Sequence, residues 1–153
     1  MRTKQKPVIN SIKNTDNYVS CKNNDECPLF DRKAEAITAG LPARYSRTLK
    51  NEITQGNALI ICDFISALKT EINLSDNYRR SNIERLINLS RFHNQKPFAD
   101  INRDDILAFL DSVRKPESLD PMHKWIDTYN TYRIQLIRFF KWLYYPVIEL
   151  IIT

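Results

Sequence analysis

The side chains best suited to contact an anionic polymer lie along one stretch of the chain, residues 125–143. Arginine offers a planar fork of N–H donors to a phosphate, and asparagine can pair with the edge of an adenine. Apolar residues recur here at intervals of four, three, four, three and four, the spacing of one helical face: Trp125, Tyr129, Tyr132, Leu136, Phe139 and Leu143. The opposite side is polar: Lys124, Asn130, Thr131, Gln135, Arg138 and Lys141. The pattern predicts an amphipathic helix with an aromatic core side and a basic side.

Groups that could carry catalysis or hold a metal are sparse. Cys21, Cys27 and Cys62 lack the close spacing of paired zinc ligands, and His93 and His123 are distant from them in sequence. We find no carboxylates at a spacing useful for acid–base chemistry. We therefore expect no metal, no cofactor, no small-molecule substrate and no enzymatic activity.

Positive charge is concentrated at the start of the chain. Residues 1–50 hold ten Lys or Arg and five Asp or Glu, whereas residues 51–153 hold thirteen of each type. Residues 1–41 are poor in periodic apolar residues, so we expect them to form a disordered or loosely ordered basic arm. Such an arm suits nucleic acid, where neutralised phosphates release counterions, and it equally suits a tail that keeps a protein soluble.

No targeting or membrane segment is evident in the sequence. No apolar run approaches the roughly 20 residues that a bilayer span requires. Residues 1–7 carry the positive charge of a signal peptide, but no apolar core follows them. We therefore expect a cytoplasmic protein without a membrane partner.

Periodic segments separated by breakers predict an all-α fold. Pro42, at a first helical position, predicts a short helix at residues 42–53, within a connecting segment of residues 42–56. Four longer helices should follow at about residues 57–73, 75–93, 102–114 and 125–143, with Ser75 as an N-cap and Asn102 with Asp105 as a capping box. Expected core residues on the first three are Ile61, Ile65, Leu68, Ile72, Ile83, Leu86, Ile87, Leu89, Ile106, Leu107, Leu110 and Val113. Residues 57–146 should thus form a compact four-helix bundle, followed by a short apolar tail at residues 147–153.

The order of several segments resembles the N-terminal core-binding domain of tyrosine recombinases, particularly archaeal integrases of the phage type. The segments are LSDNYRR at residues 74–80, KPFADI at 96–101, RDDILAFL at 103–110 and RFFKWLYYP at 138–146. That domain is a SAM-like helical bundle that binds one side of duplex DNA while a separate catalytic domain closes on the other. The resemblance implies double-stranded DNA as the partner, a role in DNA integration and site-specific recombination, and association with the nucleoid.

The resemblance also implies which residues contact DNA. In that family the second and fourth helices of the bundle approach the major groove and the flanking phosphates. Carried onto this chain, the corresponding residues are Ser75, Asn77, Arg79, Arg80, Lys124, Thr128, Asn130, Thr131, Arg133 and Arg138. Most contacts of this kind position the protein on the backbone and do not read sequence. An alternative role remains for several of them, such as an ion pair between Arg79 and Asp76.

The catalytic half of that family is not recognisable in this chain. Tyrosine recombinases use a tyrosine nucleophile, assisted by arginines and a His-x-x-Arg motif. Here His93 is followed three residues on by Lys96, and His123 by Ile126. We therefore expect a module that cannot cleave or rejoin DNA alone. Two origins are open: a truncated integrase, or a stand-alone DNA binder that assists a full-length recombinase.

Two other classes of function compete with this interpretation. A helix-turn-helix regulator needs a tight turn, often with glycine, between two helices, but Gly40 and Gly56 both precede the four long helices. A helical protein-interaction module would dock a partner through the aromatic residues of the fourth helix. A stripe at helical spacing more often faces the core of its own domain.

Overall fold

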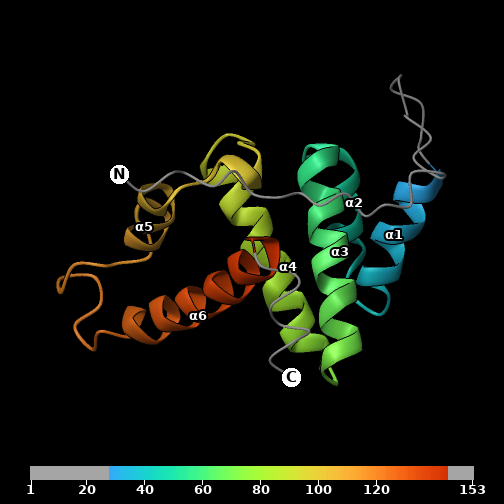
Figure 1. Cartoon of the computed structure of the whole chain (residues 1–153). Coiled ribbons are helices and arrows are strands. Elements are labelled where there is room, and N and C mark those ends of the chain that lie inside the picture. Colours follow the sequence, from blue (N-terminus) through green and yellow to red (C-terminus); the bar gives the residue numbers. More distant parts are fainter. Residues whose placement is uncertain (1–27, 145–153) are drawn as a thin grey trace.

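The computed structural model describes residues 28–144, and within this range every regular element is helical. The all-α fold predicted from the sequence is thereby confirmed. The helices follow one another along the chain, with one 3-10 turn, η1, between α4 and α5 (Figure 1). The bounds are α1 Pro28–Thr38, α2 Ala43–Asn51, α3 Gln55–Glu71, α4 Asp76–Phe92, η1 Phe98–Asp100, α5 Arg103–Asp111 and α6 Trp125–Tyr144.

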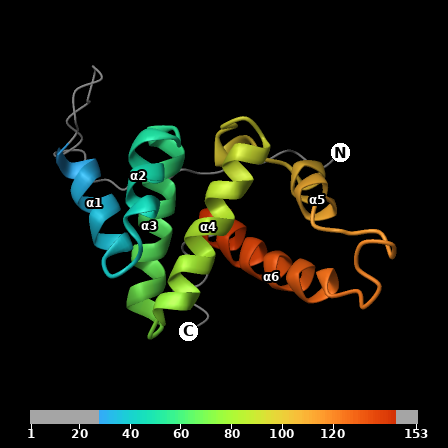
Figure 2. The same cartoon turned by 180° about the vertical axis from the view of Figure 1, so that it is seen from behind.

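The helices fall into two groups that α6 connects. In the first group α1 and α2 pack on α3, and α4 packs beside α2 and α3. In the second group α5 contacts α6, which also reaches α3 and α4. Figures 1 and 2 show α1 to α4 standing side by side, while α5 and the start of α6 extend away from α1. The position of α6 therefore decides how the two groups are joined.

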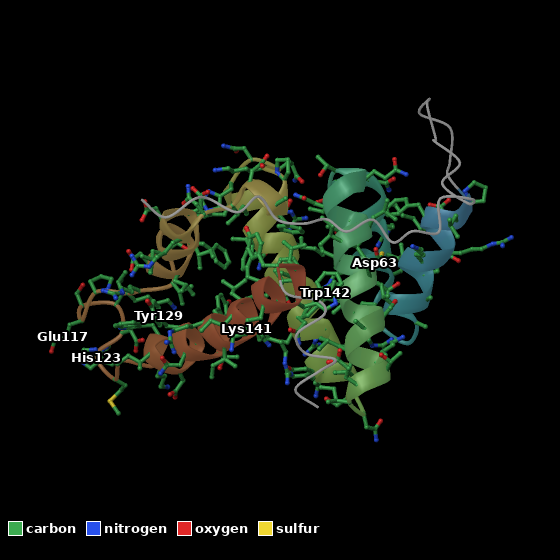
Figure 3. The ribbon with its side chains drawn as sticks, viewed as in Figure 1. Asp63, Glu117, His123, Tyr129, Lys141 and Trp142 are labelled. Atoms are coloured by element: carbon green, nitrogen blue, oxygen red, sulfur yellow. The ribbon has the colours of Figure 1, made fainter. Side chains whose placement is uncertain are left out.

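Phe139 of α6 is the centre of the aromatic core. Its side chain is fully buried. Its ring centroid lies 5.1 Å from that of Phe64 on α3 and 5.2 Å from that of Phe98 in η1, both in edge-to-face geometry. Such pairs are favourable beyond the apolar area that they bury. Trp142 adds a second contact to Phe64 at 5.4 Å, and Figure 3 shows it where α6 meets α3.

Sequence signals placed the starts of two helices correctly. The Ser75 side chain accepts a hydrogen bond from the backbone N–H of Tyr78 at 3.2 Å, which confirms the N-cap of α4. At α5, the backbone N–H of Asp105 donates to Asn102 Oδ1 at 2.9 Å, and the backbone N–H of Asn102 donates to Asp105 Oδ2 at 3.1 Å. The predicted capping box is therefore confirmed.

The predicted core is largely buried, with two clear exceptions. Ile61, Ile65, Leu68, Ile83, Leu86, Ile87, Leu89 and Leu110 are buried as expected. Ile72 is 38% exposed because it follows the last residue of α3 and takes up extended backbone, where helical periodicity no longer applies. Leu107 is 36% exposed because it borders an open groove between α5 and α6.

The prediction of a loosely ordered arm is wrong for residues 28–41. This segment contains α1, which buries Phe30, Ala34 and Ile37, at helical spacing, in the core that it shares with α3. An ion pair between Lys33 and Asp63, at 3.3 Å, joins the two helices, and Figure 3 shows Asp63 on the side of α3 that faces α1. The sequence pattern did not predict α1 because charged residues surround its few apolar residues. The remainder of the predicted arm, residues 1–27, and the tail, residues 147–153, lie outside the described residues.

Arg79 connects the end of α1 to the start of α4. Its side chain is only 7% exposed, and it donates hydrogen bonds to the backbone carbonyls of Ile37, at 3.2 Å, and Ala39, at 2.6 Å. These carbonyls lie at the C-terminal end of α1, where unpaired acceptors favour a cation. Asp76 completes the arrangement with an ion pair at 2.9 Å. Because its donors are turned inward, Arg79 does not present its charge to DNA as predicted.

Turning the chain at Gly40 makes this contact possible. Gly40 has a φ of +80°, in the left-handed region that residues with a Cβ rarely adopt. A Cβ added there would lie 3.7 Å from Arg79 Nη2, so the neighbouring guanidinium alone would not exclude it. The backbone conformation is therefore what favours glycine at this position.

Replacing Arg79 should destabilise the protein, whereas replacing its neighbour should not. Arg79→Ala should lower the free energy of unfolding by about 2–4 kcal/mol, because the carbonyls of Ile37 and Ala39 lose a charged donor. Arg80→Ala removes the same charge from an exposed site and should change it by no more than about 0.5 kcal/mol. Urea titrations followed by far-UV circular dichroism measure both values. Equal effects would contradict the buried role of Arg79.

Candidate nucleic-acid interface

A partly buried polar contact fixes the orientation of α6 on α4. The guanidinium of Arg85 lies over the ring of Tyr132, with Cζ 3.3 Å from the ring centroid. Its Nε donates to Gln135 Oε1 at 3.1 Å and its Nη2 to Ser81 Oγ at 3.2 Å. Gln135 Nε2 in turn donates to Ser81 Oγ at 2.9 Å. These directional contacts leave little freedom for α6 to rotate about its axis.

The sequence pattern did not predict this contact. Gln135 was assigned to the polar side of its helix, yet it is buried. Burial lowers the pKa of Arg85 from its ordinary value, and an arginine remains charged after such a change. The signal was present in the sequence, since Gln135 directly precedes Leu136 at the border of the apolar face. Its partner on α4, Arg85, could not be identified from the sequence.

We give the name cationic face to three exposed side chains, two from the first turns of α4 and one from α6: Asn77, Arg80 and Arg138. Arg138 Nη1 donates to Tyr78 Oη at 2.7 Å, which holds this α6 cation beside the first turn of α4. Among residues 28–144, neither Arg80 nor Arg138 forms an ion pair with an acidic side chain. Both charges are therefore available to an anion.

Two acidic side chains lie one helical turn from Arg80 on α4: Asp76, which pairs with Arg79, and Glu84. Glu84 lies one helical turn beyond Arg80 on the exposed side of α4. It accepts a hydrogen bond from Tyr45 Oη at 3.3 Å, and Tyr45 Oη accepts one from Arg44 Nη2 at 2.9 Å. The interaction with Tyr45 raises the pKa of Arg44. Because Glu84 is turned toward α2, its charge is matched there by Arg44.

The structure separates the other predicted contact residues. Ser75 is exposed, but its hydroxyl oxygen serves as the cap of α4. Thr131 is exposed and donates to the backbone carbonyl of Asp127 at 2.9 Å, and Asn130 is exposed beside it. Arg133 borders the groove between α5 and α6. Of the six candidates on the fourth helix and its start, only Arg138 donates a hydrogen bond to α4 among the described residues.

Lys124 and Thr128 face a cavity near the start of α6. This cavity has a volume of about 720 Å³ and lies between the far half of α4, the end of α5 and the loop before α6. Its lining mixes aromatic rings with both signs of charge: Phe109, Trp125, Tyr132, Lys115, Lys124 and Asp120. The indole Nε1 of Trp125 is buried without a hydrogen-bond partner in the described part of the chain. The mixed charge of this lining distinguishes it from the cationic face.

The aromatic residues considered as a docking stripe are engaged within the molecule. Phe139 is fully buried, and Tyr132 lies under Arg85. The guanidinium of Arg114 lies 5.7 Å from the ring centroid of Trp125 and 5.4 Å from that of Tyr129. Cations at such positions are attracted to the faces of the rings. Phe139 and Tyr132 of this stripe therefore contribute to the packing of the described chain.

Residues 28–144 show neither a cluster of metal ligands nor a membrane-spanning helix. In this range no group of three or more His, Cys, Asp or Glu is placed to hold a metal ion. No helix in the same range is long and apolar enough to cross a membrane. Burial raises the pKa of the Cys62 thiol to about 12, so this cysteine is a core residue without nucleophilic character.

Comparisons with protein-family models, curated proteins and solved structures find no match to this chain. The likeness to core-binding domains therefore rests on the order of the four sequence segments.

The start of α6 should be sensitive to acid through Asp120. Its carboxylate accepts a hydrogen bond from the backbone N–H of Trp125 at 2.9 Å, which lowers the pKa of Asp120 below its ordinary value of 3.8. The ionised group therefore stabilises the fold above that value, and this contribution is lost as the pH falls through the lowered pKa. Asp120→Asn keeps an acceptor but removes the charge. We expect the variant to be less stable at about pH 5, and the difference to shrink toward about pH 2.5.

A matched substitution is available in the same loop. Glu117 is exposed and lies with His123 in the loop between α5 and α6, at the end of the molecule farthest from α1 (Figure 3). Glu117→Gln removes the same charge from a side chain that accepts no backbone hydrogen bond in the described part of the chain, so its effect should vary less with pH. Urea unfolding followed by tryptophan fluorescence measures both variants. A stability difference for Asp120→Asn that stays constant across this range would contradict the role of its charge.

Proposed function

We propose that this chain binds double-stranded DNA through the cationic face, as a module of the core-binding type that does not cleave DNA. The observation that carries the proposal is the placement of Arg80 and Arg138. They come from two helices, both are exposed, and neither has an acidic partner among residues 28–144. Exposed cations on two helices that pack together suit a polymer with regularly spaced phosphates.

The surroundings of the two arginines favour binding without large rearrangement. Tyr78 holds the guanidinium of Arg138, and the Arg85–Gln135 contact restrains the helix that carries it. Groups already held in position lose less conformational entropy when a ligand binds. Asn77 adds an amide, which can donate to a phosphate or pair with a base edge in the major groove.

The sequence resemblance supports this class of DNA binder over others. The two helices that form the cationic face, α4 and α6, are the second and fourth helices in the resemblance to core-binding domains. A role in DNA integration or site-specific recombination, at the nucleoid, follows from that resemblance. Cleavage and rejoining of strands would then come from a full-length recombinase acting on the same DNA.

Removing both arginines of the cationic face should weaken DNA binding and its salt dependence. For the Arg80→Ala, Arg138→Ala variant we expect an affinity for a duplex about tenfold lower or more at low salt, because two phosphate contacts are lost. The slope of log affinity against log salt should fall by about two. Fluorescence anisotropy with a labelled duplex, measured over a series of salt concentrations, provides both values.

A control variant with the same change of net charge distinguishes binding through the cationic face from general electrostatic attraction to DNA. Arg32 on α1 and Arg103 on α5 are exposed arginines away from the cationic face. The Arg32→Ala, Arg103→Ala variant should retain most of the affinity. Equal losses for the two variants would contradict a defined face, and a parent chain that fails to bind duplex DNA at low salt would overturn the proposed function.

A further inference from the structure

An apolar groove of about 330 Å³ lies between α5 and α6. Its floor is formed by Ile106, Leu107 and Leu110 of α5 with Ile137, Phe140 and Tyr144 of α6. Leu107 and Ile137 are 36% and 40% exposed, so large apolar side chains meet solvent along this groove. Covering such a surface with apolar groups would be favourable.

The rim of the groove is positively charged. Arg133 and Lys141, both exposed, border it from α6. No acidic residue lies among the described residues that line it. A segment that complements the groove should therefore combine apolar side chains with a negative charge.

The sequence directly after α6 has this composition. Residues 147–152 read Val-Ile-Glu-Leu-Ile-Ile, which is five apolar residues around one acidic residue, Glu149. Tyr144, the last residue of α6, itself lines the groove, so this segment begins close to the groove in the chain. Pro146 opposes continuation of α6 because it lacks a backbone N–H and its ring obstructs the preceding turn.

The length of the segment matches the length of the groove. The stretch of α6 from Arg133 to Tyr144 rises about 16 Å at 1.5 Å per residue. Six residues in extended conformation span at most about 20 Å. The linkage to α6 also gives the segment a high effective concentration at the groove, which a separate molecule would lack.

We propose that residues 147–152 occupy the groove between α5 and α6 of the same chain, with their apolar side chains on its floor and Glu149 at its basic rim. Arg133 then serves the docking of this segment, on a different side of α6 from Arg138. The proposal is independent of DNA binding, since the groove shares none of its lining residues with the cationic face.

Disulfide trapping in the full chain tests this docking. Cys21 and Cys27 are first replaced by serine, while Cys62 stays as a buried, unreactive thiol. Ile137→Cys and Leu150→Cys are then introduced together, which places one thiol on the groove floor and one in the segment. Under mild oxidation with glutathione disulfide, we expect an intrachain disulfide, detected by intact mass and by a non-reducing gel.

The control variant places the first cysteine one residue further along α6, on another side of the helix. Arg138→Cys combined with Leu150→Cys has nearly the same chain separation but lies in the cationic face. The Ile137 pair should form its intrachain bond at least about tenfold faster, as docking raises the local concentration of the two thiols. Equal rates for the two pairs would overturn the proposal. Selective formation of an interchain disulfide by the Ile137 pair would also overturn it, and would assign the groove to the segment of a second copy.

Discussion

The burial of Phe139 between α3 and η1 is the constraint on which the geometry of the molecule depends. Successive residues on a helix point about 100° apart, so one fully buried residue decides where its neighbours face. Arg138 consequently reaches Tyr78 on α4, while Ile137 lines the groove beside α5. Two surfaces with different chemistry thus lie side by side on α6 because the ring of Phe139 is held between α3 and η1.

Buried polar groups give this apolar packing a defined arrangement. Asn57 is buried on α3, where its Nδ2 donates to Ser90 Oγ and to the backbone carbonyl of Lys96, both at 3.0 Å. Its Oδ1 accepts from the backbone N–H of Phe98 at 3.1 Å. An apolar core tolerates small rotations of its helices, whereas a buried amide that loses its partners is costly. Asn57 therefore positions η1, and with it one of the rings around Phe139.

Local signals in the sequence were sufficient to predict much of the helical structure. The apolar period of residues 57–143, with caps at Ser75 and Asn102, placed four helices near their observed positions. Contacts between distant residues were not accessible in this way. Arg79 and Arg80 are adjacent and chemically identical in sequence, and only the carbonyls of Ile37 and Ala39, about forty residues away in the chain, distinguish the buried one. The same limit applies to Gln135, whose burial depends on Ser81 and Arg85 of another helix.

The contact of Arg79 with the end of α1 has a consequence for how the molecule opens. Local opening is easy where few buried groups are exposed by it, and a terminal helix is often such a region. Here, detaching α1 would strip two carbonyl acceptors from a guanidinium that remains largely enclosed by protein. Fraying of α1 is thereby tied energetically to loosening of the first turns of α4. We therefore expect the two helices to behave as one cooperative unit, in which the amide hydrogens of both are protected or released together.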